Sequence, residues 1–274
     1  MEWRQLLMND AFSYQIIGKA MEVHRELGPG LDERFYHALF ERKLTGDRLD
    51  YLSRPRRELA YCGMVADVFE PDIVFPEKLV TELKCLTGAF AGEHFLQLIC
   101  YLKFWKIRVG LLFDFGKESL SYRRIEFVEP SVPCRDLASM LTDAPTQPEH
   151  GKLLERVCAG VTGVLGEFGP GYRDTTYAGL LSAALRNSGT ECVLNPVAEV
   201  QSEDGNLGQQ TCRCLLVEGK FVLKVLALRR SITAADLAIV RTYLRLLGAE
   251  VGLILNFNRT SLEVRLVGIK SSKQ

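Results

Sequence analysis

The chain has 274 residues, of which 47% are hydrophobic and 25% are charged. This composition is typical of a packed globular protein and excludes a disordered or collagen-like chain. Basic and acidic side chains both number 34, so the net charge is zero, and any contact with nucleic acid must use a local basic patch.

Signals for export or membrane insertion are absent from the sequence. No apolar run reaches the roughly 18 residues that a membrane-spanning helix needs. The first ten residues include Glu2, Arg4 and Asp10 and lack the apolar stretch of a signal peptide. The eight cysteines form no CxxC pair, which favours reduced thiols. We therefore expect a cytoplasmic protein with no membrane partner.

The first half of the chain predicts helices and strands in an α+β order. A helix capped by Asn9 or Asp10 extends through Glu26, with its apolar residues on one face. A second helix covers about 31–44 and directs Phe35, Leu39 and Phe40 inward. Strands are expected at 58–62, 67–75 and 79–86, a helix at 93–106, and strands at 108–115 and 120–127. This order predicts a mixed sheet flanked by helices.

The second half of the chain repeats landmarks of the first. Gly28-Pro29-Gly30 recurs as Gly169-Pro170-Gly171, and the apolar segment 109–115 recurs as 251–257. Matches in one order at an almost constant offset predict a duplicated domain. We expect one copy in residues 1–130, a proline-rich linker in 131–150 with a short helix at 134–141, and a second copy in 151–274. The two copies could form an intramolecular pseudo-dimer.

One predicted hairpin carries the candidate chemistry. Two apolar runs flank Pro76-Glu77-Lys78, which indicates a turn centred on Glu77. Opposed residues in such a hairpin have a constant index sum, here 154, so Asp72 should face Glu82 with Cβ atoms about 5 Å apart. Lys84 lies two residues further on and points to the same face.

Two opposed carboxylates repel each other unless a cation lies between them. At about 5 Å the repulsion costs roughly 1 kcal/mol in water and roughly 3 kcal/mol at an effective dielectric constant of 20. Mg²⁺ reverses the sign, because it prefers oxygen ligands from one or two carboxylates, water and phosphate. A nearby lysine can orient an attacking water or stabilise charge on phosphorus. The alternative to a metal site is that Glu82 and Lys84 are alternating charges on a solvent-exposed strand.

These residues resemble a known family. The first copy is similar to GxxExxY proteins, a branch of the PD-(D/E)XK nuclease-like superfamily. The resemblance rests on Gly30, Glu33 and Tyr36, on Pro71-Asp72 with Glu82-Leu83-Lys84, on Gln97 and Tyr101, and on the strand 109–115. It implies a restriction-endonuclease-like fold, present twice, with a mixed central sheet flanked by helices.

The resemblance also implies a role for each matched residue. Asp72 and Glu82 would bind Mg²⁺ (or Mn²⁺), with the Leu83 carbonyl as a further ligand. Glu33 would bind the metal directly or through water. Lys84 would assist the attacking water, and Gln97 would position Lys84 or the phosphate. The implied activity is hydrolysis of phosphodiester bonds, with DNA as the partner.

Further residues are candidates for substrate contacts, each with a structural alternative. Tyr36 and Tyr101 could touch the substrate or pack in the core. His94 shares a helix face with Gln97 and is expected at the rim of the site rather than as a base. Basic side chains in a predicted loop could meet phosphate or form a solvated surface: Arg54, Arg56 and Arg57.

The second copy departs from the pattern. At the offset of 142, Asp72 becomes Cys214, Glu82 becomes Lys224, Lys84 becomes Leu226 and Gln97 becomes Ile239, whereas Asp174 replaces Glu33. Such a site cannot hold Mg²⁺ in the same way, so we expect a pseudo-nuclease domain kept for packing or binding. Two hypotheses follow for the chain: a metal-dependent nuclease with one site, or a non-catalytic scaffold that binds nucleic acid or a protein partner.

Overall fold

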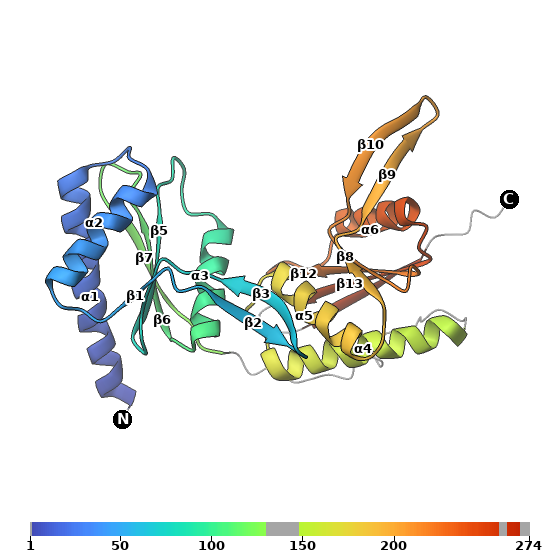
Figure 1. Cartoon of the computed structure of the whole chain (residues 1–274), viewed down its shortest axis with the longest axis horizontal. Helices are drawn as coiled ribbons and strands as arrows, with labels where there is room; N and C mark the ends of the chain where they lie inside the picture. The colour runs from blue at the N-terminus through green and yellow to red at the C-terminus, as the bar shows by residue number, and fades with distance from the viewer. Residues whose placement is uncertain (1, 130–147, 258–261, 269–274) are drawn as a thin grey trace. The chain divides into compact units, whose positions relative to one another are not determined.

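The computed structural model describes residues 2–129, 148–257 and 262–268 (Figure 1). The chain divides into two compact units. The first comprises Met1–Glu58 and Val68–Val128, and the second comprises Leu59–Asp67 and Glu129–Gln274. The short helix expected at 134–141 lies outside the described residues.

The first unit is a mixed sheet covered by helices on both faces (Figure 1). Its five strands lie in the order β1-β4-β5-β6-β7, and only the β5–β6 pairing is parallel. A separate two-stranded ribbon pairs β2 with β3, and most of its residues belong to the second unit. The elements of this half of the sequence are α1 (Glu2–Leu27), α2 (Glu33–Gly46), β1 (Leu52–Ser53), β2 (Arg57–Tyr61), β3 (Met64–Phe69), β4 (Ile73–Phe75), β5 (Leu79–Lys84), α3 (Gly92–Trp105), β6 (Val109–Asp114) and β7 (Ser121–Glu126).

The alternation of β5 decides which side chains face which helix. Leu79 and Leu83 belong to the apolar core that also contains Ile16 of α1 and Phe40 of α2. Successive side chains of a strand point to opposite faces, so Glu82 and Lys84 point away from that core. The other face is covered by α3, which lies so close that a Cβ on Gly110 of β6 would be 3.0 Å from the Leu98 side chain.

Three expectations for the first unit were wrong in detail. The first helix begins at Glu2, not after a cap at Asn9 or Asp10, because the preceding residues are also good helix formers. Phe35 does not pack inward: it is 47% exposed, and the Arg34 guanidinium lies 4.8 Å from its ring centroid. The strand expected at 67–75 is two strands, since Pro71 lacks the N–H needed to continue the ladder.

The second unit repeats the architecture. Its five-stranded sheet has the order β14-β13-β12-β11-β8, again with one parallel pairing, β12 with β13. The elements are α4 (Pro148–Phe168), α5 (Asp174–Asn187), β8 (Cys192–Leu194), β9 (Val197–Ser202), β10 (Gly205–Thr211), β11 (Leu215–Val217), β12 (Phe221–Leu226), α6 (Ala234–Leu247), β13 (Val251–Phe257) and β14 (Leu262–Gly268). The expected α+β fold, present twice, is confirmed.

Equivalent pairings support the offset of 142 between the copies. Ile73 pairs with Thr81 in the first unit, and Leu215 pairs with Leu223 in the second. Within the described residues, no helix is both long enough and apolar enough to cross a membrane. Seven cysteines lie in the described part of the chain and all are free, whereas Cys134 lies outside it.

Candidate active site

The hairpin that carries the acidic pair has the predicted register. Ile73 pairs with Thr81 and Phe75 with Leu79, so the index sum is 154 as expected. The turn closes through a hydrogen bond from the Lys78 N–H to the Phe75 carbonyl (3.0 Å), with Glu77 in a left-handed conformation (φ 60°). Continued by one residue, this register places Asp72 beside β5 at the level of Glu82.

Asp72 is held by backbone groups on both sides. Its Oδ2 accepts a hydrogen bond of 2.7 Å from the Leu83 N–H. Its own carbonyl accepts the Arg54 N–H at 2.8 Å, and the Arg54 Nε lies 3.8 Å from Oδ1. Asp72 is buried. The carboxylate therefore has a fixed position immediately before β4.

His37 is a further member of the site that the sequence analysis missed. This buried side chain lies on α2, with Nε2 3.3 Å from the Asp72 carbonyl and 4.0 Å from Oδ1. Its Nδ1 lies 3.4 Å from a carboxylate oxygen of Glu41. The helical spacing offered a signal, because His37 lies four residues after Glu33 and on the same helix face.

Glu82 is the most buried of the acidic residues in this site. It is 3% exposed, and its Oε1 accepts a hydrogen bond of 2.7 Å from the Lys84 ammonium. Its Oε2 is buried and has no hydrogen-bond partner among the described residues. Burial and the charge of Asp72 raise the pKa of Glu82 to about 8, although the ammonium of Lys84 opposes the shift. The site therefore contains a carboxylate whose charge is incompletely compensated.

Lys84 and Glu33 share this electrostatic environment. Burial lowers the pKa of Lys84, but the acidic groups of Glu82, Glu33 and Asp72 outweigh it, so the net pKa is raised. Glu33 lies at the start of α2, where burial and the charge of Asp72 raise its pKa. Over the described part of the chain, no group of three or more His, Cys, Asp or Glu side chains lies close enough together to hold a metal. Asp72 therefore acts electrostatically on both Glu82 and Glu33 although the three side chains do not form such a group.

Comparison with known proteins identifies the family. The sequence pattern of the PD-(D/E)XK nuclease superfamily matches residues 10–125 and, a second time, residues 151–267. The chain belongs to the PD-(D/E)XK nuclease superfamily. The two matched segments correspond to the two copies of the fold.

A solved structure, "Crystal structure of SSO0001", is similar at 18% sequence identity with a TM-score of 0.28. The similarity covers 45% of this chain and 62% of that chain, so less than two thirds of the solved protein is spanned. No curated protein matches.

Gln97 has a hydrogen-bond partner on its own helix, and its role toward Lys84 or the phosphate stays a prediction. The Gln97 Nε2 donates to the Tyr101 hydroxyl (2.9 Å), which in turn donates to the Glu70 carbonyl (3.2 Å). No hydrogen bond joins Gln97 to Lys84 in the described residues. His94 caps α3, since its Nδ1 accepts the Ala91 N–H at 3.0 Å. Tyr101 is 7% exposed, which supports the packing alternative.

Tyr36 is a core residue, which supports the packing alternative over a substrate contact. It is fully buried and stacks on Phe115 with 4.8 Å between ring centroids. Its hydroxyl donates to the Gly28 carbonyl (2.7 Å) and accepts the Leu31 N–H (3.2 Å). Tyr177 in the second unit makes the same bond to Gly169 (2.7 Å). This part of the motif therefore stabilises the glycine turn in both copies.

The three arginines predicted to meet phosphate have different surroundings. Arg54 contacts Asp72, as described above. Arg56 is exposed, and the Arg57 guanidinium lies 6.0 Å from the ring centroid of Trp105.

Leu83 has a fully buried side chain and supports Asp72 through its N–H, while a ligand role for its carbonyl stays a prediction.

Proposed function

We propose that the first copy is a metal-dependent nuclease that hydrolyses phosphodiester bonds of DNA. The observation that carries this proposal is the buried, unpartnered Oε2 of Glu82 beside the fixed carboxylate of Asp72. A buried carboxylate oxygen without a partner is costly, and the single ammonium of Lys84 leaves this one unpaired, so a cation is a natural occupant. Membership of a nuclease superfamily supports a phosphodiester substrate.

The donor set fits Mg²⁺ or Mn²⁺, which nucleases of this superfamily typically use. Asp72 and Glu82 offer hard oxygen ligands, and Glu33 can add another directly or through water. The Leu83 carbonyl is a candidate for the remaining protein ligand. Bound there, the ion would supply Lewis acidity and charge neutralisation at the phosphate.

The neighbouring side chains can perform the remaining tasks. Lys84 is a cation held against Glu82, so its ammonium can orient a water for in-line attack and stabilise negative charge on phosphorus. Arg54 presents a half-exposed guanidinium on the Asp72 side, where a substrate phosphate would be neutralised. His37 is a positioning residue, since it contacts Asp72 from a buried place.

The resemblance to GxxExxY proteins supports DNA as the substrate and one active copy. Cys214 and Lys224 replace the acidic pair in the second copy, which we propose is a pseudo-nuclease domain. A second candidate function is a non-catalytic scaffold that binds nucleic acid or a protein partner. It is favoured by the lack, in the described residues, of a third metal-binding group near Asp72 and Glu82.

A cleavage assay with matched lysine variants tests the proposal. Plasmid, single-stranded DNA and RNA are incubated with the full chain and Mg²⁺ or Mn²⁺. We expect metal-dependent cleavage of DNA by the wild type and by Lys78→Ala, which removes an exposed lysine from the turn of the same hairpin. Lys84→Ala should abolish it. Equal cleavage by Lys84→Ala would refute the active-site assignment, and binding without cleavage would support the scaffold.

A further inference from the structure

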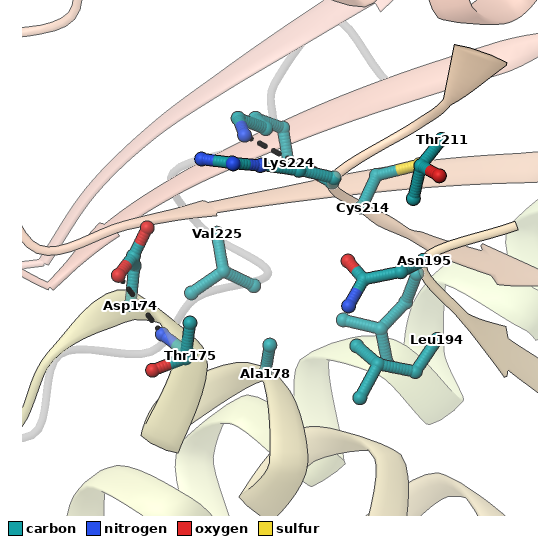
Figure 2. A pocket seen from close by; sticks show the side chains of 11 residues that line it. Asp174, Thr175, Ala178, Leu194, Asn195, Thr211, Cys214, Lys224 and Val225 are labelled. Carbon is teal, nitrogen blue, oxygen red and sulfur yellow. Dashed lines mark hydrogen bonds between the residues drawn. The ribbon is translucent and has the colours of Figure 1, made fainter.

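The second unit contains a pocket where the first has its acidic site. It has a volume of about 280 Å³ and lies between the start of α5, the end of β8 and the strands β11 and β12 (Figure 2). Its wall includes Asp174, Cys214 and Lys224, the counterparts of Glu33, Asp72 and Glu82. The pocket is therefore the degenerate site itself.

Backbone contacts show that the two sites are equivalent in space. In the first unit the Arg54 N–H donates to the Asp72 carbonyl at 2.8 Å. In the second, the Asn195 N–H donates to the Cys214 carbonyl at 2.9 Å, and both donors have left-handed backbones (φ 43° and 51°). The scaffold is thus retained while the side chains have changed.

The change inverts the charge of the site. Lys224 is partly buried, and its ammonium donates to the Arg213 carbonyl at 2.8 Å. In the described part of the protein, no carboxylate lies within 4.0 Å of the cationic groups of Lys224 or Arg213, and both residues line the pocket. The Cys214 thiol is neutral, since burial raises its pKa to about 12. Asp174 is the one acidic residue in the lining.

The ammonium of Lys224 has fewer hydrogen-bond acceptors and less opposing charge around it than it could use. Burial lowers its pKa, and the charge of the exposed Asp174 offsets only part of that effect. An ammonium can donate three hydrogen bonds, and the carbonyl of Arg213 accepts one. An anion that enters the pocket would relieve this deficit.

We infer that the pocket of the second copy binds a small phosphate monoester without a metal ion, with Lys224 and Arg213 as its cationic partners. The first copy needs a divalent cation to bring phosphate to its carboxylates, whereas the second carries its positive charge in its own side chains. Thr175, Thr211 and Asn195 add neutral hydrogen-bonding groups at the wall. Together these side chains offer more hydrogen-bond donors than the two oxygens of a carboxylate ligand need, which favours phosphate over a carboxylate.

The pocket has room for more than an inorganic phosphate. Ala178, Leu194, Leu215 and Val225 supply an apolar wall, and Figure 2 shows the side chains of Ala178 and Val225 between Asp174 and Asn195. Small-molecule sites combine apolar walls with a few polar groups in this way. A phosphorylated nucleoside matches both properties. The inference concerns the second unit alone and does not rest on catalysis by the first.

Calorimetry on the metal-free full chain tests the inference. Protein treated with a chelating resin is titrated with thymidine 5′-monophosphate, a 5′-phosphorylated oligonucleotide, inorganic phosphate, thymidine and acetate. We expect binding of the phosphate monoester, and none of thymidine. The two phosphate monoesters distinguish the two possible sources of the ligand. If the ligand is a free nucleotide, thymidine 5′-monophosphate should bind more tightly than the oligonucleotide. If the ligand is the end of a nucleic acid, the oligonucleotide should bind more tightly.

Variants of the two charged groups carry the decisive comparison. Lys224→Gln should weaken binding about tenfold or more, because it removes the partly buried cation. Asp174→Asn changes an exposed residue, is expected to fold, and should strengthen binding several-fold. Lys152→Gln removes an exposed lysine of α4 outside the pocket and should match the wild type.

Unchanged affinity in both Lys224→Gln and Asp174→Asn would overturn the inference, as would tighter binding of acetate than of phosphate. Absence of any phosphate binding at millimolar concentration would also overturn it. Loss of DNA cleavage would not bear on this result, so the two proposals can fail independently.

Discussion

The buried Glu82 carboxyl should make the metal-free protein less stable as the pH rises. Its pKa is raised from the ordinary value of 4.5 to about 8 in the fold, so the folded state holds the proton more tightly than the unfolded state. A raised pKa contributes stability that is complete below about 4.5 and is lost as the pH rises through about 8. Each pKa unit is worth about 1.4 kcal/mol, so the loss is at most on the order of 5 kcal/mol.

Glu82→Gln removes the titrating group and keeps the shape of the side chain. We therefore expect the variant to lose far less stability than the wild type between pH 5 and pH 8. Lys84 has a raised pKa and stays charged across this window, so it adds no slope. Glu33 also has a raised pKa, so it lowers the free energy of unfolding as the pH rises, and it does so in both the wild type and Glu82→Gln.

Urea unfolding followed by tryptophan fluorescence measures this effect in the first unit. Both tryptophans of the chain, Trp3 and Trp105, belong to that unit. Glu118→Gln neutralises an exposed carboxylate and should follow the wild type. Added Mg²⁺ should restabilise the wild type at pH 8 but not Glu82→Gln, because a ligand stabilises only the state that binds it. Parallel pH profiles of wild type and Glu82→Gln would refute the reasoning.

Two further variants separate positioning from packing. His37→Ala should raise the Mg²⁺ concentration needed for half-maximal cleavage about tenfold. The variant should still fold, because the equivalent residue of the second copy is Ala178. An unchanged Mg²⁺ dependence would show that His37 does not position the metal ligands. Tyr36→Phe should destabilise the first unit by about 1–3 kcal/mol in the tryptophan assay, whereas Tyr177→Phe should leave that signal unchanged. Loss of cleavage at unchanged stability would instead make Tyr36 a substrate contact.

The hairpin shows what local rules can predict. The two apolar runs around Pro76-Glu77-Lys78 indicate the turn, and the turn sets the register, because a one-residue shift would exchange the faces of Glu82 and Leu83. The duplication was visible for a similar reason. Glycine turns and buried strands leave short sequence signatures that survive even where the polar site has changed.

The details that the sequence did not predict depend on tertiary contacts. Phe35 is exposed although its neighbour Tyr36 is fully buried, and helical periodicity alone did not separate the two. Gln97 donates to Tyr101 because their spacing of four residues brings them together on α3. The pocket around Lys224 depends on residues from four segments, so no local motif marks it.

Crystals grown with Mn²⁺ and examined by anomalous diffraction test the central claim most directly. The account predicts a manganese ion bound by Asp72 and Glu82, and no manganese beside Cys214 and Lys224. Metal in the second copy, or none between the two carboxylates of the first at millimolar Mn²⁺, would contradict it.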